Sequence, residues 1–272
     1  SFNGDLSAWN VSQVRNMDEM FHSAEAYNAD LSAWNVSKVM EMSGMFYHAK
    51  SFNSDLNTWN VASITNMNAL FARATSFNGD LSAWNVLQVN SMHKMFGYAK
   101  SFNADLSAWD VAKVTSMRRM FDNAGLFNGD LNAWNVRNVK NVSNMFREAR
   151  SFNGDLNAWN VSQVTRMERM FYQARSFNGD LSAWNVSQVR NMDEMFHSAE
   201  AFNADLSAWD VSKVATMRMM FRSARSFNGE LSAWNISSGT DTSSMFYETL
   251  ISSVRKPKRL QDAQGTSQST PT

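Results

Sequence analysis

The fold of this protein is decided by the pattern of its first 25 residues, SFNGDLSAWNVSQVRNMDEMFHSAE (residues 1–25), because this pattern recurs ten times without an insertion, ending at Leu250. All ten tryptophans lie 25 residues apart, from Trp9 to Trp234. A fixed period of this length is typical of one small unit that is copied in series and stacked. The period predicts one elongated domain over residues 1–250, built of ten 25-residue coils.

Two hydrophobic patterns follow each other within every unit. In the first unit, the alternation around Trp9 predicts a short strand over residues 8–12, and Asn16 is a suitable N-cap for a helix that follows. Four apolar residues spaced as on one helical face come next: Met17, Met20, Phe21 and Ala24. Because every unit runs in the same order, the strands are expected to be parallel. The expected fold class is an α/β solenoid, leucine-rich-repeat-like, in which each coil is a short parallel β-strand plus a short helix.

Because the units are expected to stack, identical residues at the same position of each unit should form rows along the solenoid. Two such rows are predicted. The tryptophan rings are expected to form a continuous internal stack, because a buried indole ring removes a large apolar area from water. Asn occupies the third position of all ten units, as at Asn3, and we expect its amide to bond backbone groups of its own and neighbouring coils. The first unit has no cap, so its apolar edge is expected to be exposed and to need preceding sequence or a covering partner.

Composition narrows the class of function. Lys plus Arg and Asp plus Glu number 25 each, which gives no electrostatic footprint for nucleic acid. The absence of Cys excludes disulfides, thiol catalysis and thiolate metal sites, and no apolar run is long enough for a transmembrane helix. No nucleophile motif, phosphate-binding loop or zinc-protease motif occurs. We therefore expect a non-enzymatic protein without a cofactor.

The string L-x-x-W-x-V resembles the strand of leucine-rich repeats with Trp in place of the second Leu. The longer phrase FNGDLSAWNVSQVRNMDEMF resembles the BspA-like leucine-rich-repeat surface proteins, a 25-residue variant found in bacterial surface lipoproteins and unicellular eukaryotes, over residues 1–250. This resemblance implies a solenoid with a role in surface adhesion or protein binding. It also implies an extracellular or cell-surface location, and it supplies no catalytic residues.

Two faces are candidates for binding. The eighth, tenth and twelfth positions of each unit form a strip of small and polar groups. This strip is either a consequence of tight coiling or a platform for a protein or a glycan. Its candidate partner-binding residues are Asn60, Asn85, Leu87, Asp110, Asn135 and Arg137. The variable positions 13, 15, 16, 18, 19, 22, 23 and 25 carry most of the Lys and Arg and all four His, and they are predicted to be mainly a solvated face.

The fifth position of each unit is Asp, with Glu230 in the last. Stacked like charges need compensation, for which backbone N–H groups are the first expectation. Calcium is the alternative, although each coil supplies few oxygen ligands. The weak candidate metal ligands are Asp5, Asp30, Asp55, Asp80 and Asp105.

Residues 251–272 are expected to form a flexible polar tail. A basic cluster at its start, Arg255, Lys256, Lys258 and Arg259, could contact acidic partners or anionic lipid. Taken together, the sequence predicts a non-catalytic repeat scaffold for protein–protein interaction or adhesion through an extended face. The alternatives are an architectural subunit of a large assembly and a carbohydrate- or calcium-dependent surface adhesin.

Overall fold

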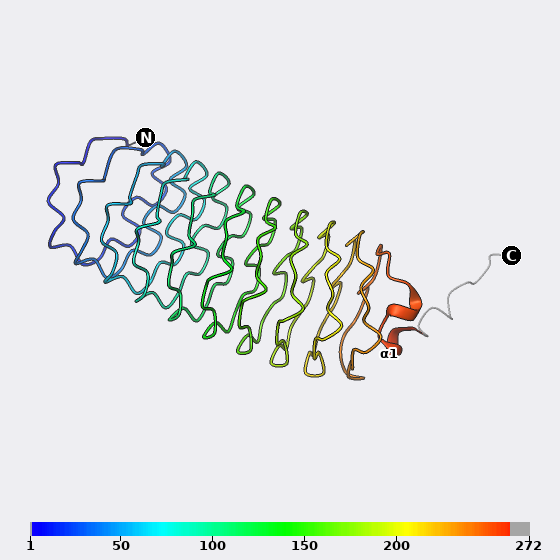
Figure 1. Cartoon of the computed structure of the whole chain (residues 1–272). Coiled ribbons are helices and arrows are strands. Elements are labelled where there is room, and N and C mark those ends of the chain that lie inside the picture. The colour runs from blue at the N-terminus through cyan, green and yellow to red at the C-terminus, as the bar shows by residue number, and fades with distance from the viewer. Residues whose placement is uncertain (1, 262–272) are drawn as a thin grey trace.

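The computed structural model describes residues 2–261, and within this range the chain winds as a stack of similar coils along one axis (Figure 1). Parallel backbone bridges connect Asn16 to Glu41, Glu41 to Asn66, and so on to Asp241 in the last coil. Successive coils therefore lie side by side in the same direction, which confirms the predicted repeat solenoid. Below, coil 1 is residues 1–25 and coil 10 is residues 226–250.

The predicted strand and helix of each coil are both wrong. Among residues 2–261 the only regular elements are the 3-10 helix η1 (Ser253–Arg255) and the α-helix α1 (Lys258–Gln261), both after the last coil. Parallel pairing involves one residue per coil, at the position of Asn16 and not at residues 8–12. Residues 17–24 form consecutive β-turns, in which the backbone N–H groups of residues 20, 22 and 24 each donate to the carbonyl three residues earlier. Glu19 and Ser23 adopt positive φ angles of 56° and 58° in these turns.

The stacking distance explains why turns replace the helix. The rings of Phe21 and Phe46, at equivalent positions of adjacent coils, are 5.4 Å apart between centroids. Packed α-helices need about 8–10 Å between their axes, so one helix per coil cannot be stacked at this spacing. Alternate N–H groups point instead to the next coil: Met17 donates to the Glu41 carbonyl at 2.9 Å and Phe21 to the Met45 carbonyl at 2.8 Å. The backbone of the turns is thereby hydrogen-bonded between coils rather than within a helix.

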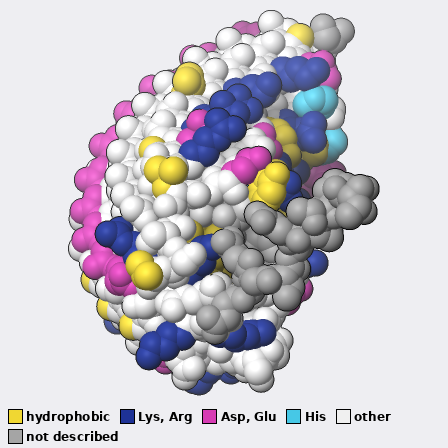
Figure 2. Space-filling model, turned by 90° about the vertical axis from the view of Figure 1, so that its right-hand side faces the viewer, with side chains coloured by type: hydrophobic (Ala, Val, Ile, Leu, Met, Phe, Trp, Pro, Cys, Tyr) yellow, Lys and Arg dark blue, Asp and Glu magenta, His cyan; other side chains and the backbone are white. Residues whose placement is uncertain are grey.

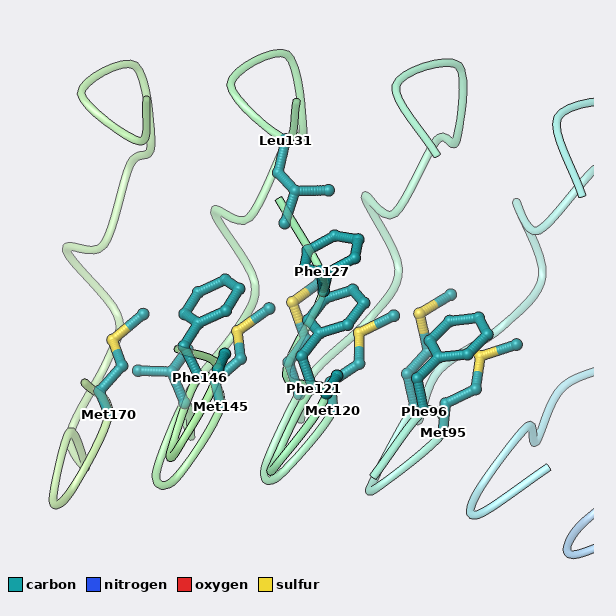
Figure 3. Close-up of a cluster of buried hydrophobic side chains, with 14 of the residues drawn as sticks. Met95, Phe96, Met120, Phe121, Phe127, Leu131, Met145, Phe146 and Met170 are labelled. Atoms are coloured by element: carbon teal, nitrogen blue, oxygen red, sulfur yellow. The ribbon is translucent and has the colours of Figure 1, made fainter. Parts of the chain in front are cut away.

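The core is a set of side-chain columns that run along the solenoid. The nine tryptophans from Trp34 to Trp234 are between 2% and 4% exposed, and adjacent rings such as Trp34 and Trp59 stack at 6.4 Å with an interplanar angle of 2°. Met, Phe and Leu side chains form parallel columns beside them (Figure 3). The tryptophan stack therefore faces inward as predicted. Coil 1 is the exception, because Phe2 and Trp9 are 54% and 56% exposed at the open end.

The asparagine row forms the ladder that the sequence predicts. The side-chain oxygen of Asn3 accepts a hydrogen bond of 2.9 Å from the backbone N–H of Asn28, in the next coil. Asn28 and Asn53 continue the series, which extends to the bond between Asn203 and the N–H of Asn228. Each of these bonds gives an acceptor to a backbone N–H at a bend, where that N–H makes no turn or sheet bond.

The region after the last coil differs from the predicted flexible tail. Residues 251–261 pack against coil 10: Ile251 is buried, and Leu260 packs against the core. The guanidinium of Arg259 donates to the carbonyls of Ser237 and Ser238, the latter at 2.8 Å. Part of the predicted basic cluster therefore closes this end of the solenoid. Residues 262–272, the rest of the predicted tail, lie outside the described residues.

Candidate functional site

The side chains of the predicted strip are exposed, but the side-chain oxygens of its Asn and Asp residues already accept hydrogen bonds from backbone N–H groups two residues along the chain. All six candidate residues are exposed, with Leu87 at 37%. The side-chain oxygen of Asn85 accepts a hydrogen bond of 3.1 Å from the Leu87 N–H, and Asp110 accepts one of 2.9 Å from the Ala112 N–H. Asn60 and Asn135 make the same contact two residues along the chain. The asparagines therefore stabilise their own turns rather than bonding to each other, and this contact repeats along the solenoid.

The acidic row at the fifth position is compensated by the backbone. One carboxylate oxygen of Asp5 accepts a hydrogen bond of 2.8 Å from the Ser7 N–H, and the candidates Asp30, Asp55, Asp80 and Asp105 make the same bond in their coils. This bond is the main reason that the pKa of Asp5, Asp30 and Asp105 lies below the ordinary value. Figure 2 shows acidic side chains in a file along one edge of the molecule. Among residues 2–261, no three His, Cys, Asp or Glu side chains are grouped so that they could hold a metal ion.

A third surface, which we call the turn face, carries the residues that differ most between coils. It consists of the side chains at positions 16, 18, 19, 22 and 23 of coils 3–10. A polar cavity of about 300 Å³ lies on it, lined by five arginines, three carboxylates and two asparagines. We call this cavity the arginine groove, after its arginines: Arg118, Arg119, Arg166, Arg169 and Arg218. Figure 2 shows Lys and Arg side chains gathered in a band on the surface, with acidic and His side chains among and beside them.

Three of the five arginines of the groove are paired with its three carboxylates. Arg166 pairs with Glu168 within its own coil. Arg169 donates to Glu194 at 2.6 Å, in the next coil. The guanidinium of Arg218 donates to Asp193 at 3.0 Å, and Asp193 also accepts the backbone N–H of Arg218 at 2.8 Å. These bonds raise the pKa of Arg166, Arg169 and Arg218, so all three remain cationic.

The two remaining arginines of the groove have no such partner within it. Within residues 2–261 the side chain of Arg118 makes no hydrogen bond and no ion pair. Arg119 Nε is buried and lacks a hydrogen-bond acceptor, and its contact with Asp122 is long, at 3.8 Å. The pKa of the nearby His93 imidazole is lowered, first by burial and then by the charge of Arg118. The field at this end of the groove is therefore positive.

A buried ion pair adjoins the groove. Asp122 is 1% exposed and accepts a hydrogen bond of 2.7 Å from Arg147 Nε, in the next coil. Arg147 also donates to Glu148 at 2.6 Å and to the hydroxyl of Tyr98 at 2.8 Å. Burial raises the pKa of the Asp122 carboxyl, because it outweighs the attraction of Arg147. This network connects the turn face across three coils beside the groove.

Aromatic and cationic side chains stack on the same face. Arg73 lies over the ring of Tyr98, 5.0 Å from its centroid, and Arg222 lies over Tyr247 at the same distance. The rings of Tyr172 and His197 stack at 4.8 Å. Such contacts present flat aromatic and guanidinium surfaces in fixed orientations.

The turn face was missed at the sequence level, where these positions were predicted to be mainly a solvated face. A signal was present: residues of opposite charge occupy the same position in successive units, as in Asp122 and Arg147, or Asp193 and Arg218. A separation of 25 residues places such side chains next to each other in a solenoid of this period. Both pairs are ion pairs in the structure.

No helix within residues 2–261 has the length and apolar character needed to cross a membrane.

No curated protein matches this chain.

Several solved structures are similar to this chain. A leucine-rich cell surface protein of Faecalibacterium prausnitzii is 10% identical, with 82% of each chain covered and a TM-score of 0.38. A leucine-rich-repeat protein from Bacteroides ovatus is 10% identical, with 82% of this chain and 78% of that chain covered and a TM-score of 0.30. The chain in the mouse RP105/MD-1 complex is 12% identical, with 83% of this chain and 39% of that chain covered and a TM-score of 0.34. This chain thus spans less than half the length of the mouse protein.

One family model matches nearly the whole solenoid, in three overlapping segments that comprise residues 1–80, 51–159 and 141–255. This protein therefore belongs to the family described as "Mycoplasma protein of unknown function, DUF285".

Proposed function

We propose that this protein is a non-catalytic scaffold that binds a partner protein through the turn face of its solenoid. The observation that supports this function is the concentration of unlike charged and aromatic side chains on one face of an otherwise uniform stack. Arg and Tyr, which line this face, are the residue types enriched in protein–protein interfaces and their energetic centres. Solenoids commonly use such extended surfaces for binding.

The strip around Leu87 and Arg137 is the second candidate surface of the same scaffold. It is exposed and flat, and Leu87 offers an apolar contact there. Its asparagine oxygens are already bonded to the backbone, which leaves fewer groups for a partner than the turn face offers. We therefore rank the turn face first. We also propose a cell-surface location and a role in adhesion. This part of the proposal is supported by the sequence resemblance to the BspA-like surface proteins.

A second function, as an architectural subunit of a large assembly, is the alternative for the same scaffold. Phe2 and Trp9 are more than half exposed on the outer face of coil 1, and Met20 is 39% exposed. This face can therefore contact an apolar surface, whether that surface belongs to a further coil or to another protein.

Site-specific photo-crosslinking tests these surfaces against each other. A photoreactive phenylalanine analogue replaces Tyr172 on the turn face, Ser162 on the strip or Phe2 at the open end, in the cell that produces the protein. We expect a discrete protein adduct from position 172 and none from position 162. Adducts from position 162 alone would transfer the function to the strip, and adducts from position 2 alone would favour the architectural role. The scaffold proposal is wrong if none of the three positions yields a protein adduct.

A further inference from the structure

We propose that the arginine groove binds an acidic peptide segment of the partner, with carboxylate groups of that segment paired to Arg118 and Arg119. This inference rests on the proposed scaffold function and names the chemistry of its partner. The groove differs from a general basic patch because its charges are arranged over five successive coils, from Arg118 in coil 5 to Arg218 in coil 9.

The groove has unused positive charge at one end. Five guanidinium groups line it with three carboxylates. The pairs Arg169–Glu194 and Arg218–Asp193 neutralise the end formed by coils 7–9. The positive charge without a close partner is therefore that of Arg118, beside Arg119, whose only ion pair is the long one of 3.8 Å to Asp122.

The hydrogen-bond inventory points to the same two residues. Within residues 2–261 the Arg118 side chain makes no hydrogen bond and no ion pair, so its guanidinium donors can all serve a ligand. Arg119 Nε is buried and faces Asp122 at 3.8 Å, but the Arg119 side chain as a whole is 40% exposed. Its other guanidinium donors can therefore bind a carboxylate in the groove together with those of Arg118.

The carboxylates of the groove decide against a dense polyanion. Glu168, Asp193 and Glu194 lie among the arginines, and a sulfated glycan or a nucleic acid would bring its charges against them. A peptide carries its carboxylates singly, at spacings that side chains can adjust. The guanidinium group forms paired hydrogen bonds with a carboxylate, which gives both orientation and charge neutralisation.

The spacing of the coils suggests the form of the peptide. The rings of Phe121 and Phe146, and those of Phe146 and Phe171, are each 5.6 Å apart between centroids, so two coil steps correspond to about 11 Å. An extended polyproline-type chain rises about 3.1 Å per residue and presents every third residue on one side, about 9 Å apart. A chain with an acidic residue at every third position therefore keeps its carboxylates near the arginine-bearing coils, with the paired contact at Arg118 and Arg119 in coil 5.

Fluorescence anisotropy with the full chain tests the proposal. The probe is a fluorescein-labelled twelve-residue peptide of the repeat glutamate–proline–alanine, and its matched control has glutamine in place of glutamate. We expect the acidic probe to bind about tenfold more tightly than the control at low salt. The double variant R118Q/R119Q should lose this difference, and R225Q, which removes an exposed arginine outside both the groove and the strip, should retain it. Glu194→Gln should tighten binding, because it leaves Arg169 without its carboxylate.

The thermal midpoint of each variant, measured by circular dichroism, shows whether it is folded. Equal binding of the two probes, or equal losses in R118Q/R119Q and R225Q, overturns the proposal. Displacement of the acidic probe by dextran sulfate at a far lower concentration than by unlabelled acidic peptide assigns the groove to a polyanion instead. A protein adduct at position 172 without acidic-probe binding would contradict this inference alone. Failure of the crosslinking experiment would contradict the scaffold function itself.

Discussion

The indole nitrogen of Trp109 donates a hydrogen bond of 3.0 Å to the carbonyl oxygen of Leu81, a residue of the preceding coil. The same bond recurs from Trp34 to Trp234. Each tryptophan thus fills the core and also gives a second hydrogen bond to a backbone carbonyl that already accepts an N–H of its own coil, as Leu81 does from Trp84. A phenyl ring could replace the first role but has no donor for the second.

The first prediction concerns this bond. Trp134→Phe removes the second donor to the Leu106 carbonyl, which keeps the bond from the Trp109 N–H, and should lower the free energy of unfolding by about 2–4 kcal/mol, mainly from the lost ring volume. Trp9→Phe is the matched control, because Trp9 is largely exposed and should change stability by less than about 0.5 kcal/mol. Urea unfolding monitored by circular dichroism measures both. Similar losses in the two variants would show that the indole bond is not the source of the effect.

The second prediction distinguishes the observed turns from the helix expected from the sequence. Ala69 has a φ of 54°, a left-handed conformation that costs an alanine about 1–2 kcal/mol. Ala69→Gly should therefore leave stability unchanged or raise it by up to about 1 kcal/mol, once the greater chain entropy of glycine is subtracted. In a helix the same change would lower stability by about 1 kcal/mol.

The control for this change is Ala74→Gly, in the same coil. Ala74 is buried and is not among the residues with positive φ, so its replacement should lower stability by about 1 kcal/mol. A thermal midpoint that falls equally in both variants would support a helical backbone at residue 69.

The third prediction is a pH dependence that arises from Asp122. Burial raises its pKa above the ordinary value of 3.8, so the folded protein holds this proton more tightly than the unfolded chain does. Ionisation of Asp122 therefore lowers stability as pH rises from about 3.8 through the folded pKa. Asp122→Asn should remove this fall, so the stability difference between variant and wild type should shift in favour of the variant as pH rises from 4 to about 7.

The acidic row at the fifth position predicts the opposite change of stability with pH, and it can be compared with Asp122 in the same protein. The pKa values of Asp5, Asp30 and Asp105 are lowered, so their contribution is present above about 3.8 and is lost as pH falls through the folded pKa values. Asp105→Asn should therefore flatten the acid limb of the stability profile. Urea unfolding at several pH values separates the two limbs, and a pH-independent difference between Asp122→Asn and wild type would contradict the assignment.

The fourth prediction concerns the closed end of the solenoid. Arg259→Ala removes the donor to the carbonyls of Ser237, Ser238 and Thr240 and should lower the thermal midpoint. Lys258→Ala is the control, because Lys258 is exposed and adjacent in α1. Hydrogen exchange should show the loss of protection confined to coils 9 and 10, since a solenoid coil contacts only its neighbours. Equal midpoints for the two variants would show that Arg259 does not hold this end.

The sequence by itself determined the period, the parallel stack, the buried columns and the asparagine ladder. The reason is that a repeat of fixed length places identical residues beside each other whatever the local backbone conformation. Trp34 and Trp59 had to meet, and an apolar residue in that row could be stable only inside.

Only the tertiary structure decided the local conformation and the site. The spacing of Met17, Met20 and Phe21 fits a helical face, but it fits a series of β-turns equally well, and the close approach of neighbouring coils leaves no room for stacked helices. The groove depends on which arginines find carboxylates across coils, as Arg169 does and Arg118 does not. That outcome is set by side-chain geometry between coils, which no single unit of the repeat contains.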